Sequence, residues 1–260
     1  MQIIIHSSKT MRPAPGKETT LSKPLLIEKA SHLSKELRSL SIPELMKLMG
    51  ISAKLAEQTA TTIAEWTTKP AKQIAAIDSF RGDIYSGLQA NAWTEHDKAF
   101  AQKHLRILSG LYGVLRPLDG ISPYRLEMGY RFSTSDHKNL YDFWGNAIAK
   151  TFAPEEPIVN LSAVEYSKTI TRYVTTELFT PTFYTVNPKT KLPTFVVVHT
   201  KIARGAFANW MIKHQIDTPA DLQNFSDLQY HYDPSLSTDH EPAFVCKEFG
   251  GLGLSVRLTT

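Results

Sequence analysis

The sequence predicts an α+β fold in a single domain that spans residues 1–260. Segments with helical periodicity and N-terminal capping residues fill most of the first 109 residues. Runs rich in β-branched and aromatic residues dominate the second half, where they favour mixed or antiparallel strands. The length allows one large domain or two modest ones, and we expect one compact unit.

The N-terminal half is predicted to be mainly helical, after a short strand over residues 2–6 and an irregular connection over residues 11–23. The helices are expected over residues 25–40, 41–49, 52–66 and 94–110, the last including Leu105 and Leu108. Ser41, Ser52 and Thr94 are the expected N-caps, because a hydroxyl oxygen can accept a hydrogen bond from a first-turn amide.

The second half is richer in strand signals. Strands are expected over residues 157–161, 178–186, 194–200 and 243–249, and a helix over residues 201–216. Residues 187–191, with the sequence Asn-Pro-Lys-Thr-Lys, separate two of these strands and are expected to form a hairpin loop. Glycine and proline recur over residues 110–132, so no regular helix is expected there.

Composition and charge restrict the functional classes. A hydrophobic content of 42% with 21% charged residues is typical of a soluble globular protein, and no apolar run approaches a membrane-spanning length. The N-terminus has three consecutive aliphatic residues without a basic segment before them, which does not fit a secretory signal, so we expect a cytoplasmic protein. The net charge of +4 favours encounter with DNA or RNA without requiring it.

Cysteine and histidine usage gives no sign of a metal or cofactor. Cys246 is the single cysteine, which excludes an intramolecular disulfide and zinc patterns built on paired cysteines. It lies in an apolar segment of strand type and is expected to be a buried structural thiol. The nine histidines are scattered and none has a recognisable ligand spacing. We therefore predict no metal site and no cofactor.

Residues 41–66 contain two predicted helices that are joined by a turn of about two residues. If Gly50 adopts a positive φ, the amides of the turn can point outward beside the N-terminus of the second helix, where an anion is favoured. The predicted DNA-binding residues are Lys47, Gly50, Ile51, Ser52 and Lys54. Such contacts would hold phosphates without reading base sequence. The alternative is a plain helix corner with an exposed polar turn.

A second group of polar residues lies in glycine-containing stretches with aromatic side chains. Its arginines could hold phosphate while a carboxylate acts as a general base, or its charges could simply pair under long loops. The catalytic candidates are Lys9, Asp83, Asp119 and Glu127. The candidates for a pocket that binds a small anionic ligand are Arg81, Tyr85, Arg116, Tyr124, Arg125 and Arg204. Lys9 stands out because it follows the first strand, where strand ends often present ligand groups.

Several segments carry a resemblance that covers most of the chain. They are HSSKTM at residues 6–11, FRGDIYSGLQA at 80–90, LSGLYGVLRPLD at 108–119, PYRLEMG at 123–129, LYDFWG at 140–145, Val159-Asn-Leu161 with Glu165 and Tyr166, and Ala203-Arg-Gly205. These segments resemble the YaaA family of bacterial peroxide-stress proteins. The resemblance implies a single α+β domain of unusual topology with a helix-hairpin-helix element at about residues 41–66 that is able to bind DNA. It also implies a cytoplasmic role in limiting peroxide damage, linked to lower free intracellular iron.

Three hypotheses for the function stay open. The first is a peroxide-stress protein that binds duplex or distorted DNA through the turn at residues 50–54, with little sequence preference. The second is an enzyme acting on a nucleic-acid base or a phosphorylated metabolite, with chemistry like that of a DNA lyase or glycosylase in which Lys9 forms a Schiff base. The third is a stress protein that acts through a protein partner. Iron is expected as a cellular outcome and not as a bound cofactor.

Overall fold

A five-stranded sheet with the strand order β6-β5-β1-β8-β9 forms the centre of the computed structural model, which describes residues 1–11 and 20–250. β1 (Gln2–His6) runs parallel to β5 (Leu105–Ser109) and to β8 (Ile158–Asn160), and β8 runs parallel to β9 (Leu178–Phe179). β6 (Gly113–Leu115) is antiparallel to β5. The three isoleucines of β1 are all buried, as expected for a parallel strand covered on both faces.

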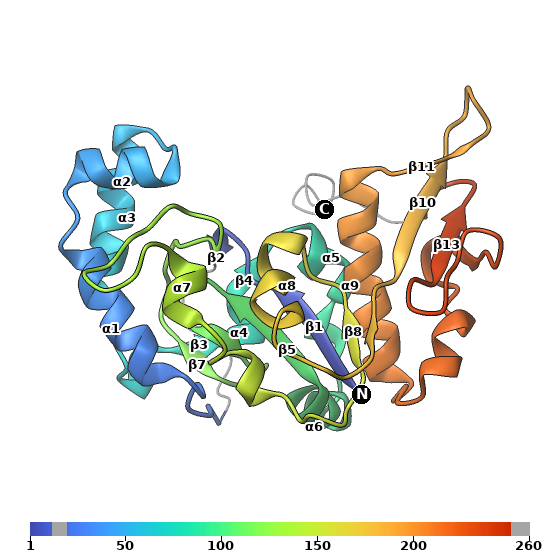
Figure 1. Ribbon diagram of the computed structural model, residues 1–260, viewed down its shortest axis with the longest axis horizontal. Helices are drawn as coiled ribbons and strands as arrows, with labels where there is room; N and C mark the ends of the chain where they lie inside the picture. Colours follow the sequence, from blue (N-terminus) through green and yellow to red (C-terminus); the bar gives the residue numbers. More distant parts are fainter. Residues whose placement is uncertain (12–19, 251–260) are drawn as a thin grey trace.

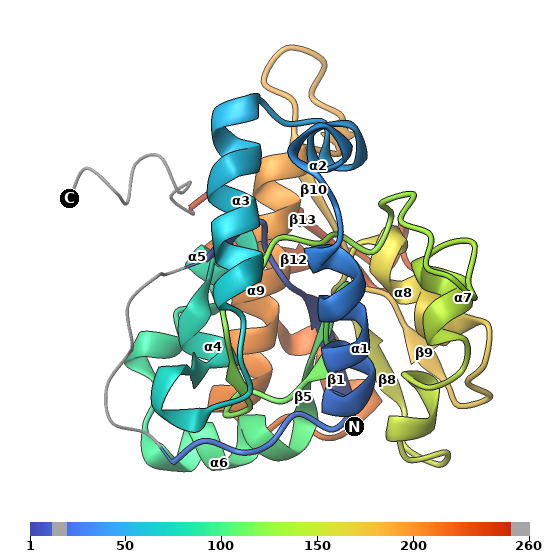
Figure 2. The same ribbon diagram turned by 90° about the vertical axis from the view of Figure 1, so that its left-hand side faces the viewer.

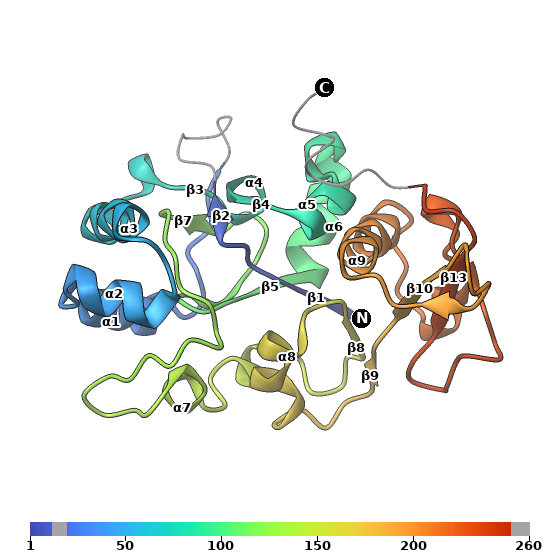
Figure 3. The same ribbon diagram turned by 90° about the horizontal axis from the view of Figure 1, so that it is seen from above.

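Helices flank the central sheet on both sides. Figure 3 shows α5 and α6 on one side of β1 and β5, and α7 and α8 on the other. The α-helices are α1 (Ile27–Arg38), α2 (Ile42–Met49), α3 (Ala53–Glu65), α4 (Ala76–Ser79), α5 (Asp83–Leu88), α6 (Glu95–His104), α7 (Leu140–Trp144), α8 (Val164–Thr171) and α9 (Val197–Lys213). Short 3-10 helices cover Pro70–Lys72, Ala90–Ala92, Ala149–Thr151, Pro219–Asn224 and Asp227–Gln229. In Figure 1, α1, α2 and α3 form a group at one end of the molecule.

A second sheet lies beyond α9, at the opposite end of the molecule (Figure 1), and has the order β11-β10-β13-β12. Its strands are β10 (Thr182–Val186), β11 (Pro193–Thr194), β12 (His231–Tyr232) and β13 (Ala243–Cys246). The ring of Phe183 on β10 lies 5.8 Å from that of Phe207 on α9 and 5.6 Å from that of Phe244 on β13. Two small sheets pair β2 (Thr10–Met11) with β4 (Phe80–Arg81) and β3 (Ile74–Ala75) with β7 (Gly120–Ile121).

The predicted helices on either side of Gly50 form as expected. At the start of α2, the Glu44 carboxylate accepts a hydrogen bond of 2.8 Å from the Ser41 amide. Gly50 ends this helix with φ +62°, the left-handed conformation on which the predicted phosphate contact depends. At the start of α3, the Ser52 hydroxyl accepts a hydrogen bond of 3.4 Å from the Leu55 amide.

The helix predicted for residues 94–110 is too long. It ends at His104, and Leu105–Ser109 form β5 next to β1. Most side chains of β5 are buried, and a short apolar run of this kind does not distinguish a buried strand from a helix by periodicity. This correction matters for the site, because β5 brings Ser109 to the same edge of the sheet as His6.

Two strand predictions in the second half also need correction. Residues 178–186 form two strands in different sheets, because Pro181 lies between β9 and β10 and cannot donate a ladder hydrogen bond. Residues 194–200 are not a strand: β11 ends at Thr194 and α9 begins at Val197. The Thr200 amide donates a hydrogen bond of 2.9 Å to the Val196 carbonyl, so the first turn of α9 includes Val197 and Val198. The preference of valine for strands is weak and does not prevent this helix from forming.

Two glycines allow α5 and α9 to pack with their backbones in contact. A Cβ on Gly205 would lie 1.8 Å from the Ile84 carbonyl oxygen, and one on Gly87 would lie 2.0 Å from the Ile202 carbonyl oxygen. No side chain fits at such distances, so these positions require glycine. The close packing holds α5 and α9 together beside the end of β1.

One hydrophobic cluster includes side chains from the central sheet, from α1 to α3 and from the second sheet. Most of the connection predicted for residues 11–23 lies outside the described residues, and Ser22 forms an isolated parallel bridge with Asp119. Within residues 1–11 and 20–250, no helix combines the length and hydropathy needed to cross a bilayer.

Candidate functional site

The carboxyl ends of three parallel strands meet at one edge of the central sheet. His6 ends β1, Ser109 ends β5 and Asn160 ends β8. Because β1 lies between the other two strands, the segments that follow all three come together there. Ligands bind at this end of the strands in open parallel sheets, which makes the segments after β1, β5 and β8 the candidate site.

His6 is held as a neutral, oriented imidazole. Its Nδ1 accepts a hydrogen bond of 3.1 Å from the Ala163 amide, and its ring stacks on Tyr166 with a centroid distance of 4.9 Å. Burial, with the nearby positive charges of Arg204 and Lys201, lowers the pKa of His6 to about 3. An Nδ1 that accepts leaves the proton on Nε2, so the imidazole is a fixed neutral tautomer at physiological pH.

Hydroxyl groups gather around the ends of β1 and β5. The Ser7 hydroxyl donates to the Tyr166 hydroxyl over 3.4 Å, and Ser109 Oγ lies 2.6 Å from the hydroxyl of Tyr124. The Tyr85 hydroxyl donates to the His6 carbonyl over 2.9 Å. Burial raises the pKa of all three tyrosines above its ordinary value, so they stay neutral at physiological pH.

A lysine and a carboxyl group meet next to these hydroxyls. Lys9 Nζ lies 3.9 Å from Glu127 Oε2, with the lysine side chain half exposed and the carboxyl group mostly buried. Burial raises the pKa of Glu127, while the charge of Lys9 opposes this rise. Glu165 lies close by, accepts a 2.7 Å hydrogen bond from the Gly129 amide and also raises the pKa of Glu127. Glu127 is therefore suited to take up and release a proton.

The predicted pocket residues are partly brought together. Arg125 adds positive charge beside Glu127, and Arg204 does so beside His6. The Nε atoms of both arginines are buried without a hydrogen-bond acceptor in the described residues. Arg81 lies on β4, which pairs with the Thr10 segment after Lys9. Asp83 begins α5, two residues before Tyr85.

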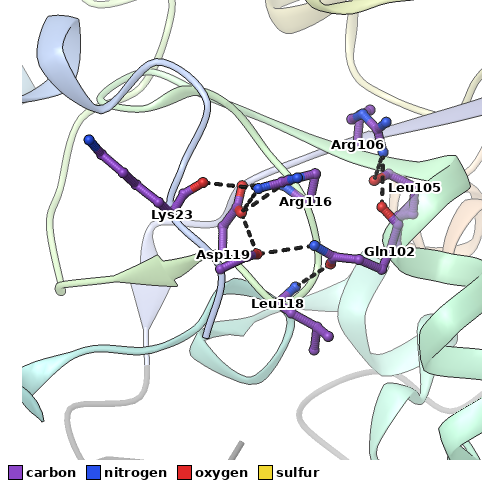
Figure 4. A network of polar contacts seen from close by, with 8 residues as sticks. Lys23, Gln102, Leu105, Arg106, Arg116, Leu118 and Asp119 are labelled. Carbon is purple, nitrogen blue, oxygen red and sulfur yellow. Dashed lines mark hydrogen bonds and ion pairs between the residues drawn. The ribbon is translucent and has the colours of Figure 1, made fainter. Parts of the chain in front are cut away.

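Arg116 and Asp119 lie at the other end of the sheet. β6 pairs antiparallel with β5, from Ser109 opposite Gly113 to Ile107 opposite Leu115, so the chain leaves β6 toward the start of β5. There Asp119 is fully buried and its Oδ1 accepts hydrogen bonds from Arg116 Nε and Nη2, at 3.2 and 2.9 Å (Figure 4). This pair forms an internal network away from Lys9 and Glu127.

The turn between α2 and α3 is exposed at Lys47, Gly50, Ser52 and Lys54. Contrary to the expectation that the turn amides point outward together, the amides of Gly50 and Ile51 both donate to the Met46 carbonyl, over 2.9 and 3.3 Å. A left-handed C-cap turns these two amides back onto α2. An anion at this turn would therefore have to use the amides from Ser52 onward, at the start of α3.

The comparison with known families adds an independent observation. A family model described as "Peroxide stress protein YaaA" matches residues 1–236, which include the central sheet, α2, α3 and the Lys9 and Glu127 segment. The chain belongs to this family. The resemblance carried by the segments at residues 6–11, 80–90 and 108–119 is thus confirmed.

Relatives within the YaaA family match along nearly their whole length. A UPF0246 protein of Salinispora tropica is 52% identical over 258 residues, covering 99% of this chain and 98% of the relative. A UPF0246 protein of Cellvibrio japonicus is 39% identical over 258 residues, covering 94% and 98%. These relatives therefore match nearly the whole length of the chain.

Several residues at this edge of the YaaA-family chain are absent from the sequence-based candidates, among them His6, Glu165 and Tyr166. Glu165 and Tyr166 follow β8 by a few residues, so they would have been found if residues 158–160 had been recognised as a parallel neighbour of β1. His6 carries no local signal, because its role depends on contacts with Ala163 and Tyr166, which are far away in the sequence.

The described part of this YaaA-family chain contains no group of three or more histidine, cysteine, aspartate or glutamate side chains placed to hold a metal ion. Glu127 and Glu165 are neighbours, and Lys9 contributes a positive charge to the same place. Together with Arg125, which also lies beside Glu127, the set holds two positive and two negative side chains around one carboxyl group that can exchange a proton.

Proposed function

We propose that this protein binds DNA in the cytoplasm as part of the peroxide-stress response and helps limit iron-dependent oxidative damage. The observation that carries the proposal is the exposed turn between α2 and α3. Gly50 is left-handed and open, since a Cβ there would meet nothing within 4 Å. A DNA backbone could therefore approach this turn closely.

The charges around the turn support the proposal. α3 has no acidic residue in its first turn, where Lys54 is exposed, and Lys47 lies in the last turn of α2. The partial positive charge of a helix N-terminus favours a phosphate at this point. Ile51 packs against the hydrophobic core, so the turn is anchored on one side and open on the other. Contacts of this kind bind the backbone without base preference.

The double variant Lys47→Ala with Lys54→Ala is expected to weaken binding to duplex DNA and to reduce its salt dependence. Each phosphate contact contributes about 0.9 to the slope of log K against log salt concentration, so the slope should fall by about two. Fluorescence anisotropy of labelled duplex DNA over a salt series measures this slope. The control removes two exposed lysines elsewhere, Lys103→Ala with Lys150→Ala. An equal decrease in the salt-dependence slope in both double variants would contradict the assignment of the α2–α3 turn as the DNA contact.

The Lys9 and Glu127 pair supports a second candidate function, an enzyme that acts on a nucleic-acid base or sugar. An unprotonated lysine amine can attack the aldehyde carbon of an opened abasic sugar, and loss of water from the adduct gives a Schiff base. The Glu127 carboxylate beside Lys9 can take the proton that the lysine ammonium must lose and return it to the departing hydroxyl, and the raised pKa of Glu127 favours this uptake. Arg125 would hold an adjacent phosphate.

For this second function, sodium borohydride is expected to trap wild-type protein covalently on duplex DNA with one abasic site, and not Lys9→Arg. The arginine keeps the positive charge beside Glu127 but cannot form the imine, so binding should persist while the adduct disappears. A denaturing gel reads out the adduct. Lys103→Ala serves as a control that leaves both the Lys9 and Glu127 pair and the α2–α3 turn intact. An adduct that survives in Lys9→Arg, or none in the wild type, would reject this role for Lys9.

A further inference from the structure

Residues 187–198, which we call the arm, expose a run of large apolar side chains. The exposed fractions are 64% for Leu192, 56% for Phe195, 55% for Val197 and 44% for Val198. These side chains follow one another along the β10–β11 hairpin and the first turn of α9. Scattered apolar residues on a surface are ordinary, but a contiguous group points to a contact with another molecule.

The turn at the start of the arm, which joins β10 to β11, is held by its own hydrogen bonds. The Asn187 side chain accepts hydrogen bonds from the amides of Lys189 and Thr190, over 2.9 and 3.2 Å. The Asn187 backbone accepts from the Lys191 amide over 2.8 Å and donates to the Leu192 carbonyl over 2.9 Å. These bonds fix the turn that separates the paired strands, so little ordering would be needed when a partner binds.

The stretch of sequence that contains the arm is basic, which favours contact with a polyanion. Between Glu177 and Asp217 the sequence contains no aspartate or glutamate. The same stretch carries five basic residues, Lys189, Lys191, Lys201, Arg204 and Lys213. Lys189 and Lys191 are exposed in the turn next to the apolar run. Exposed lysines beside an aromatic and aliphatic surface are typical of contacts with single-stranded or distorted nucleic acid.

The position of the arm relates it to the proposed DNA contact. In Figure 1 and in the perpendicular view of Figure 2, the α2–α3 pair and the arm both lie at the top of the molecule. They stand at opposite ends in Figure 1, with the central sheet between them. The arm continues directly into α9, which carries Lys201 and Arg204 toward His6 at the strand ends.

We propose that the arm is a second DNA-contacting element, which places Phe195 and Leu192 against unpaired bases of distorted DNA while Lys189 and Lys191 contact phosphates. This inference rests on the proposed function. Apolar side chains that insert at unstacked steps are a general way to recognise deformed DNA, and aromatic rings stack on any base. A second copy of the chain is a poorer occupant, because two arms without carboxylates would bring like charges together.

The test compares wild type with Leu192→Ser, Phe195→Ser on two probes, a perfect duplex and the same duplex with a central unpaired bubble that contains 2-aminopurine. Wild type is expected to bind the bubble about tenfold more tightly than the duplex and to change the 2-aminopurine fluorescence by stacking. The arm variant should lose both effects while its duplex affinity changes less than threefold. Val164→Ser with Leu236→Ser removes two exposed apolar side chains elsewhere and should behave as wild type.

The outcomes separate this proposal from the one on which it rests. If the arm variant keeps the bubble preference and the fluorescence change, the arm proposal is overturned, and a loss of duplex binding in the Lys47, Lys54 variant would still support the proposed function. If wild type binds neither probe, both proposals fail. If the arm substitutions instead lower the sedimentation coefficient of the free protein, the surface joins two copies of the chain and the arm proposal is again overturned.

Discussion

Replacement of Asp119 by alanine is expected to lower the free energy of unfolding by about 3–5 kcal/mol, and the midpoint of thermal unfolding by roughly 6–20 °C. Asp119 is fully buried, and its carboxylate accepts hydrogen bonds from the side chain and the amide of Arg116 and from the Ser22 hydroxyl. Alanine would leave the Arg116 guanidinium without its countercharge in a partly buried place.

Thermal and urea unfolding of Asp119→Ala, Asp119→Asn and the exposed control Asp239→Ala measure this effect. Asparagine keeps the shape of the side chain and loses its charge, so its cost should lie between those of the other two variants. Asp119 is among the sequence-based catalytic candidates, and the experiment therefore decides between two roles. A stable Asp119→Ala protein that has lost a catalytic activity would restore Asp119 as a catalytic residue and contradict a structural one.

The helices around Gly50 could be predicted because their signals are local. The capping box of Ser41 and Glu44, the left-handed Gly50 and the N-cap Ser52 all act within a few residues, and the structure has α2 and α3 at the predicted places. The same holds for β1, whose apolar run is short and starts the chain. Local hydrogen bonding and side-chain periodicity are readable from sequence alone.

The site could be predicted less well, because it depends on which strands become neighbours. The site assembles because β5 is a strand parallel to β1, which brings together Lys9, Glu127, Arg125, Tyr85 and Tyr124. This strand is hard to predict, because the apolar pattern of β5 continues that of the preceding helix α6. The charges of Arg116 and Asp119 fit the same sequence pattern as those of Arg125 and Glu127, yet the antiparallel turn into β6 carries them to the other end. The direction of β6 relative to β5, which the apolar pattern of the sequence does not specify, causes this separation.

Because of the His6 imidazole, the free energy of unfolding is expected to depend strongly on pH below about 6.5. Burial and the charges of Arg204 and Lys201 lower its pKa from 6.5 to about 3. A histidine whose folded pKa is depressed binds fewer protons in the native state than in the unfolded one. Its contribution to stability is therefore fully present above pH 6.5 and is lost as the pH falls toward 3. A difference of this size corresponds to roughly 4–5 kcal/mol at most.

Urea unfolding at intervals from pH 7.5 to pH 4 is expected to show this loss in wild type and a flatter dependence in His6→Asn. The asparagine carbonyl oxygen can replace Nδ1 as the acceptor for the Ala163 amide, and it does not titrate. His231→Asn, at an exposed position, should keep the wild-type pH dependence. Equal slopes in wild type and His6→Asn would mean that His6 is not held as a buried neutral ring. A flatter pH dependence in His6→Asn than in wild type would support a fixed neutral imidazole at the end of β1. The Nε2–H of such an imidazole can donate a hydrogen bond to a ligand bound beside Arg204.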